Sequence, residues 1–140
     1  MDIRKYFVPW VLAGLAILIL EAVVAALVQA VMPYSLESLA GMRTLQDPLM
    51  VLYFLTPWLV SLGMVVLYAK TKESFKETHA REKAIMFGFL VWLVAVVPTT
   101  FVIFTTMTYP LGFSINKLLG GLVAYIGGAY IIVKYIKYNS

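Results

Sequence analysis

Glu21 is the residue with the clearest chemical potential, because it is the one ionisable side chain deep inside a long apolar stretch. An acidic side chain at the centre of a membrane helix costs about 2.5–3.5 kcal/mol on insertion scales. Such a carboxyl normally faces the interior of a helix bundle and finds polar partners there. We therefore expect Glu21 to be buried, protonated and hydrogen-bonded, since a neutral carboxyl both donates and accepts.

The candidate partners of Glu21 are residues that lie at a similar depth when each apolar stretch is counted from the same side. Together with Glu21 they form a predicted intramembrane polar cluster of Thr56, Pro57, Pro98, Thr99, Thr100 and Tyr125. Each proline leaves a carbonyl of the preceding turn without its usual donor. We expect Glu21 to bond near Pro98–Thr100 or to Tyr125. Two interpretations stay open: a polar clasp that orients helices, or a proton- or cation-responsive site.

No other set of residues in the sequence forms a catalytic or metal-binding pattern. The chain has no cysteine, which excludes disulfides, thiolate metal sites and cysteine nucleophiles. The single histidine, His79, lies among lysines and arginines, whereas a metal site needs several converging ligands. We therefore predict no catalytic residues, no metal and no cofactor, and we expect that the protein is not an enzyme.

Four apolar stretches must position Glu21 and its candidate partners. Hydrophobic residues make up 62% of the chain and charged residues 13%, against about 45–50% and about 25% in soluble domains. A soluble domain of 140 residues could not bury so much apolar surface, so a nucleic-acid-binding domain and a disordered chain are excluded. Each stretch is long enough for a membrane helix of about 20 residues; the stretches are 7–31, 49–69, 84–106 and 118–136.

These stretches predict the architecture and its environment. We expect an all-α fold, in which residues 1–140 form a single membrane domain, a polytopic four-helix transmembrane bundle. Each run is continuous rather than alternating, and four strands could not close a barrel in lipid. The predicted location is the cell membrane, with the lipid bilayer as partner and no nucleic acid.

The placement of lysine and arginine predicts the orientation of the bundle. These residues collect on the cytoplasmic side of membrane proteins. Arg43 and Lys117 fall on one side of a four-span arrangement, and the other nine fall on the opposite side: Arg4, Lys5, Lys70, Lys72, Lys76, Arg81, Lys83, Lys134 and Lys137. We predict that both termini are cytoplasmic.

The linker 70–83 joins the second and third stretches and carries charges of both signs. Glu73 with Lys76, and Glu77 with Arg81, have helical spacing, which favours a short exposed helix. One interpretation is a solvated connector that fixes the topology. The other is a surface that touches anionic lipid or a partner protein.

Small residues recur at every fourth position on the first and fourth stretches. The positions are Ala22, Ala26 and Ala30 on the first, and Gly120, Ala124 and Gly128 on the fourth. Such spacing lets the backbones of membrane helices approach closely. We expect these residues to pack within the chain, with a dimer face as the alternative.

The third stretch contains the sequence GFLVWLVAVVPTT, from Gly88 to Thr100. It resembles the third helix of an uncharacterised family of small prokaryotic four-span membrane proteins, which carry a similar Gly-Phe…Trp-Leu…Pro-Thr pattern. The resemblance covers only this part of the chain. It implies a multi-pass membrane protein of prokaryotic origin and adds no mechanism.

Two classes of function follow from these observations. The scarcity of polar residues in the stretches favours a structural or interaction subunit, in a homo-oligomer or a larger membrane complex. The alternative is a small proton- or solute-transporting membrane protein that uses Glu21. Pro57 and Pro98 favour the alternative, because broken helices near the midplane mark the binding sites of many transporters.

Overall fold

The computed structural model describes residues 2–76 and 79–138, and the side chains of all of these except 137 and 138. In this part of the chain the fold is all-helical. Four segments there are long and apolar enough to cross a membrane, namely Ile3–Val31, Pro48–Ser74, Ala80–Thr106 and Leu111–Ile136. The chain is therefore a multi-pass, all-helical membrane protein with four spans, as the composition predicts.

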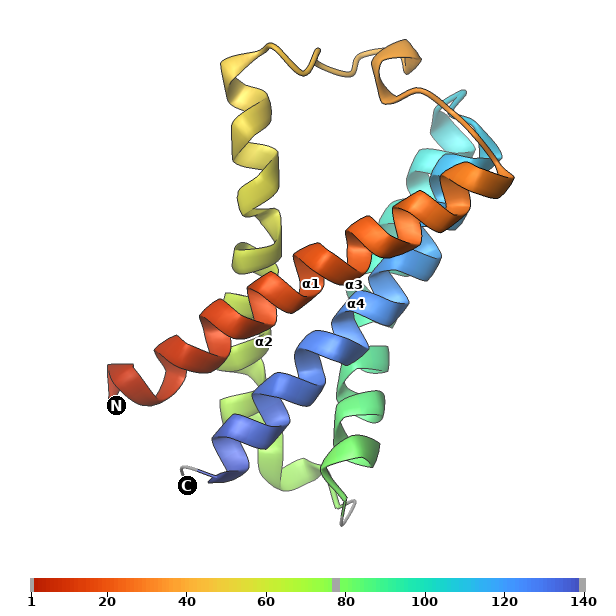
Figure 1. The fold of residues 1–140 in the computed structure, drawn as a ribbon. Coiled ribbons are helices and arrows are strands. Elements are labelled where there is room, and N and C mark those ends of the chain that lie inside the picture. The colour runs from red at the N-terminus through yellow and green to blue at the C-terminus, as the bar shows by residue number, and fades with distance from the viewer. Residues whose placement is uncertain (1, 77–78, 139–140) are drawn as a thin grey trace.

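The elements follow one another with short connections. They are α1 (Ile3–Val31), η1 (Leu36–Ser38), η2 (Pro48–Leu55), α2 (Thr56–Thr71), η3 (Lys72–Ser74), α3 (Ala80–Thr106) and α4 (Leu111–Tyr138). The second span consists of η2, α2 and η3. The start of α1, the link between α2 and α3, and the end of α4 all lie toward the lower end of the bundle in Figure 1, an arrangement consistent with four crossings.

Helix α4 begins at Leu111, earlier than the position 118 expected from hydropathy. The polar residues Asn116 and Lys117 come directly before that expected start. In the structure the Asn116 Nδ2 donates to the Tyr34 hydroxyl at 2.9 Å. The Lys117 ammonium lies over two aromatic rings, at 5.6 and 5.7 Å from their centroids. The Asn116 amide and the Lys117 ammonium thus both find partners within the first two turns of the helix.

Helix α4 is the central element of the bundle. It packs along both α1 and α3, whereas α2 packs mainly against α1 and more lightly against α4. Helix α1 crosses its neighbours obliquely (Figure 1). Since α3 packs on α4 rather than on α1, a side chain of α1 and a side chain of α3 at equal depth are not automatically neighbours.

The α3–α4 contact is close because Gly88 has no side chain. A Cβ at this position would lie 2.7 Å from the Cα of Ile126 and 2.9 Å from the carbonyl oxygen of Tyr125. One turn further along α3, the Trp92 Nε1 donates to the Leu118 carbonyl at 2.8 Å. The two helices are therefore joined by backbone-to-backbone packing and by an interhelical hydrogen bond.

The α1–α2 contact is held by tryptophan. The Trp10 Nε1 donates to the Trp58 carbonyl at 2.7 Å, and the Trp58 Nε1 donates to the Val11 carbonyl at 3.2 Å. The Ser61 hydroxyl donates to the Trp10 carbonyl at 3.0 Å. The ring of Trp58 fills the space beside Gly14, where a Cβ would collide with it. These contacts fasten the first turns of α2, next to η2, to the first half of α1.

The other half of the second span is η2. Its backbone stands apart from α1, α3 and α4 in Figure 1, and the Lys117 ammonium of α4 reaches across to Tyr53. It is a 3-10 helix of eight residues, although such helices rarely exceed 3–4 residues. Nearly all of its side chains are exposed: Leu49, Val51, Leu52, Tyr53, Phe54 and Leu55. In the second span, α2 thus packs against α1, whereas most side chains of η2 are exposed.

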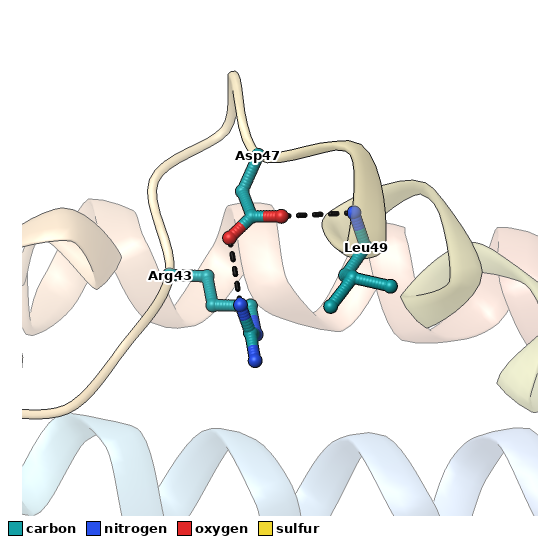
Figure 2. A network of polar contacts seen from close by, with 3 residues as sticks. All are labelled: Arg43, Asp47 and Leu49. Atoms are coloured by element: carbon teal, nitrogen blue, oxygen red, sulfur yellow. Dashed lines mark hydrogen bonds and ion pairs between the residues drawn. The ribbon is translucent and has the colours of Figure 1, made fainter.

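Asp47 caps the start of η2 (Figure 2). One carboxylate oxygen accepts from the Leu49 N–H at 2.9 Å, and the other accepts from the Arg43 Nη1 at 2.8 Å. The Arg43 guanidinium, followed by the Leu49 N–H, holds the pKa of the Asp47 carboxyl below its ordinary value. The folded chain therefore binds this proton more weakly than the unfolded chain does.

A pH dependence follows from that lowered pKa. The stabilisation is fully present above the ordinary aspartate value of about 3.9, and it is lost as the pH falls through the lower value of the folded chain. We expect Arg43→Gln to move the pKa of Asp47 back toward the ordinary value, as measured by an NMR titration of the carboxyl carbon. An unchanged titration would show that Arg43 does not lower the pKa of Asp47.

The linker 70–83 is not one continuous helix. Helix α2 ends at Thr71, η3 follows, and α3 begins at Ala80. Between them Phe75 packs against Tyr68 and Phe87, with ring centroids 6.0 and 5.7 Å away. Within the described residues Glu73 and Lys76 form no ion pair. Glu77, the predicted partner of Arg81, lies outside the described residues.

Candidate functional site

Glu21 lies on the same face of α1 that α2 covers nearer the N-terminus of that helix. Gly14 is seven residues earlier, and residues seven apart share a helix face. Trp58 of α2 covers Gly14, but η2 does not extend this cover to Glu21. The Glu21 side chain is half-buried. Within the described part of the chain, no hydrogen bond reaches its carboxyl.

The predicted partners of Glu21 are divided by the structure into buried and exposed residues. Pro57, Thr100 and Tyr125 are buried, whereas Thr56, Pro98 and Thr99 are exposed. The Thr99 hydroxyl donates to the Ala95 carbonyl on its own helix at 2.8 Å. Tyr125, the one titratable residue among the predicted partners, lies within electrostatic range of Glu21.

The expected bond from Glu21 to the third helix is not found among the described residues. The physical reason is the position of α4, on which α1 and α3 both pack. Pro98 and Thr99 share the depth of Glu21 but are exposed on α3. Equal depth therefore does not bring these residues together.

Lys117 is a site residue that the comparison of depths along the apolar stretches did not identify. It lies within electrostatic range of Glu21, and its Nζ donates to the Tyr53 hydroxyl of η2 at 3.5 Å. Its Nζ and the Glu21 carboxylate are too far apart for an ion pair, since Arg43–Asp47 is the ion pair found in the described residues. The signal that could have identified Lys117 is Pro110, because a helix that begins directly after this proline includes Lys117 in the fourth span.

The site therefore combines an acid, a base and two phenols from three elements. Glu21 belongs to α1, Lys117 and Tyr125 to α4, and Tyr53 to η2. We refer to these four residues as the outer polar set. Glu21 makes no hydrogen bond within the described chain and Lys117 makes one long one. The set can thus donate to, and accept from, a polar group that another molecule supplies.

The two series of small residues have different surroundings. Gly120, Ala124 and Gly128 are buried on α4. A Cβ at Gly128 would lie 2.9 Å from Ile17 of α1, and one at Gly120 would lie 3.8 Å from Val24. The other series is exposed on α1, at Ala22, Ala26 and Ala30. The packing within the chain that we expected of these alanines is therefore not made.

No family model, curated protein or solved structure matches this chain. The resemblance of the third span to small prokaryotic four-span proteins accordingly stays a prediction. Among the described residues, no three His, Cys, Asp or Glu side chains gather as metal ligands do. His79 is exposed just before α3.

Proposed function

We propose that this protein is a non-catalytic subunit of a membrane assembly, and that its partner is another membrane-spanning chain or a second copy of itself. The partner would bind the half of the bundle that contains the outer polar set. The proposed location is the cell membrane of a prokaryote, with the chain termini in the cytoplasm.

The observation that carries the proposal is the state of Glu21. A half-buried carboxyl in a membrane span, with no hydrogen bond from the described residues of its own chain, leaves a polar group without compensation. Membrane helices satisfy such groups with polar side chains of neighbouring helices. A partner that brings a donor or acceptor to Glu21 would remove this cost.

Two exposed surfaces beside Glu21 support the same proposal. Ala22 and Ala26 are exposed, and small residues at this spacing allow a helix to approach closely. Across from them, η2 leaves Tyr53 48% exposed and Phe54 52% exposed. A partner helix would contact side chains on both sides of the outer polar set.

The second candidate is a small proton- or solute-transporting protein. Its support is the placement of Lys117 and Tyr125 within electrostatic reach of Glu21. Opposite charges on α1 and α4 that form no ion pair in the described chain are a suitable pair for a polar solute or for a proton. The two candidates differ in what Glu21 must do: bind a partner or change its protonation.

Association is tested with Ala22→Leu. Ala22 is exposed, so the single chain accommodates a leucine, whereas a closely packed partner would be displaced. Overpacking costs about 1–3 kcal/mol, which corresponds to association weaker by about 5- to 150-fold. The measurement is the number of copies and co-purifying chains in particles cut from native membrane, by mass and by single-molecule bleaching.

The matched control is Val94→Leu on α3, at a residue that is 76% exposed and outside the proposed contact. We expect the control to retain the partner and Ala22→Leu to lose it. A wild-type particle that contains one copy of the chain and only lipid would contradict the proposed subunit role. Equal loss in both variants would place the contact elsewhere.

A further inference from the structure

The net charge of the chain is confined to one end of the bundle. Counted along the sequence, the end that holds both termini and the linker has nine lysines and arginines and four carboxylates, a net charge of +5. At the opposite end two cations and two carboxylates balance, and Glu21 lies between the ends. We call the first of these the basic end.

The cations of the basic end are available to a binding partner. Those with exposed side chains are Arg4, Lys70, Lys76, Arg81 and Lys134. Among the residues that the structure describes, the ion pair found is Arg43–Asp47, which lies at the other end. None of these exposed cations is therefore neutralised by a carboxylate in the described chain, and each keeps its charge for an anion.

An aromatic cluster fixes part of the basic end against the bundle. Tyr68, Phe75 and Phe87 pack together, with centroids of Tyr68 and Phe87 5.1 Å apart. Tyr68 and Phe87 are buried. Because Phe75 is anchored here, the lysines on either side of it, Lys72 and Lys76, are held where the spans end instead of extending into water on a free loop.

We propose that the basic end binds the headgroups of anionic phospholipids in its own leaflet. The cations come from the ends of all four spans, which places them at the level of the headgroups. Lys134 also lies 5.1 Å from the ring of Tyr130, and tyrosines are common at this level of a membrane. A compact soluble anion would meet only a few of these cations at once, whereas a layer of lipid headgroups meets all of them.

The test measures headgroup preference directly. The purified chain is placed in nanodiscs with equal amounts of phosphatidylcholine and phosphatidylglycerol, and the retained lipids are identified by native mass spectrometry. We expect phosphatidylglycerol to be enriched, and the enrichment to fall as salt is raised, because exposed charges are screened. Equal retention of the two lipids would overturn the proposal.

The variant that tests the named residues is Lys70→Gln/Lys76→Gln/Arg81→Gln. Each cation near an anionic surface contributes about 1 kcal/mol, so the loss of three weakens binding of short-chain phosphatidylglycerol about a hundredfold. The charge-preserving variant Lys70→Arg/Lys76→Arg/Arg81→Lys should bind like wild type. Exposed substitutions of this kind change stability little, which circular dichroism checks.

Two further outcomes would contradict the proposal. The first is unchanged binding in the glutamine variant that retains wild-type helicity. The second is displacement of phosphatidylglycerol by inorganic phosphate at an equal concentration, which would indicate a site for a free anion. The proposal does not depend on the subunit role, since the variant leaves Glu21 and Ala22 untouched and the partner should remain bound.

Discussion

Replacing Gly88 with alanine is expected to lower the free energy of unfolding by about 1–3 kcal/mol, the usual cost of overpacking. The new Cβ would lie 2.7 Å from the Cα and 2.9 Å from the nitrogen of Ile126. These are backbone atoms of α4, so no side-chain rotation can relieve the contact. Helices α3 and α4 must separate, and the Trp92–Leu118 hydrogen bond lies along the same interface.

The matched control for this prediction is Gly63→Ala in α2. A Cβ at Gly63 would meet nothing within 4 Å, so the same chemical change occurs without a collision. Alanine is favoured over glycine inside a helix by up to about 1 kcal/mol, so we expect this control to be at least as stable as wild type. Unfolding of both variants in mixed micelles, followed by circular dichroism, measures the difference. Equal stability of the two variants would mean that the α3–α4 contact does not limit stability.

The number of spans was predictable because the signal is a simple one. A membrane helix must satisfy its own backbone and cover about 20 residues with apolar side chains, and both properties are visible in the sequence. The start of α4 was not predictable in this way. In the sequence Lys117 looks like a polar boundary. In the structure its ammonium lies over the Phe113 ring, one turn earlier on α4, and over the Tyr53 ring, which is distant in the sequence.

The partners of Glu21 were less predictable, for a geometric reason. Counting residues along a span gives depth, but contact also requires that two side chains face each other around their helix axes. Thr99 has the required depth and bonds to its own helix instead. The side on which each helix packs depends on close contacts such as Gly88 against Ile126, and a single sequence does not indicate which small residue meets which helix.

Replacing Glu21 with leucine is expected to stabilise the isolated chain and to abolish its function. A hydrogen-bonded clasp predicts a loss of roughly 0.5–2 kcal/mol, but no hydrogen bond from the described chain reaches this carboxyl. Removal of an unsatisfied polar group relieves a cost of about 1–3 kcal/mol. The free energy of unfolding of Glu21→Leu in mixed micelles should therefore rise. A fall of the size expected for a clasp would reveal an intrachain partner.

Glu21→Gln then separates the two candidate functions. The amide keeps a donor and an acceptor but cannot titrate. If Glu21 binds a partner chain, the glutamine variant retains the partner in native-membrane particles and Glu21→Leu loses it. If Glu21 carries protons, the glutamine variant folds and assembles normally, yet pH-dependent flux into liposomes is abolished. The control is Glu37→Gln, an exposed carboxylate in η1. Wild-type assembly and flux in both Glu21 variants would exclude both roles, because the carboxyl would then be dispensable.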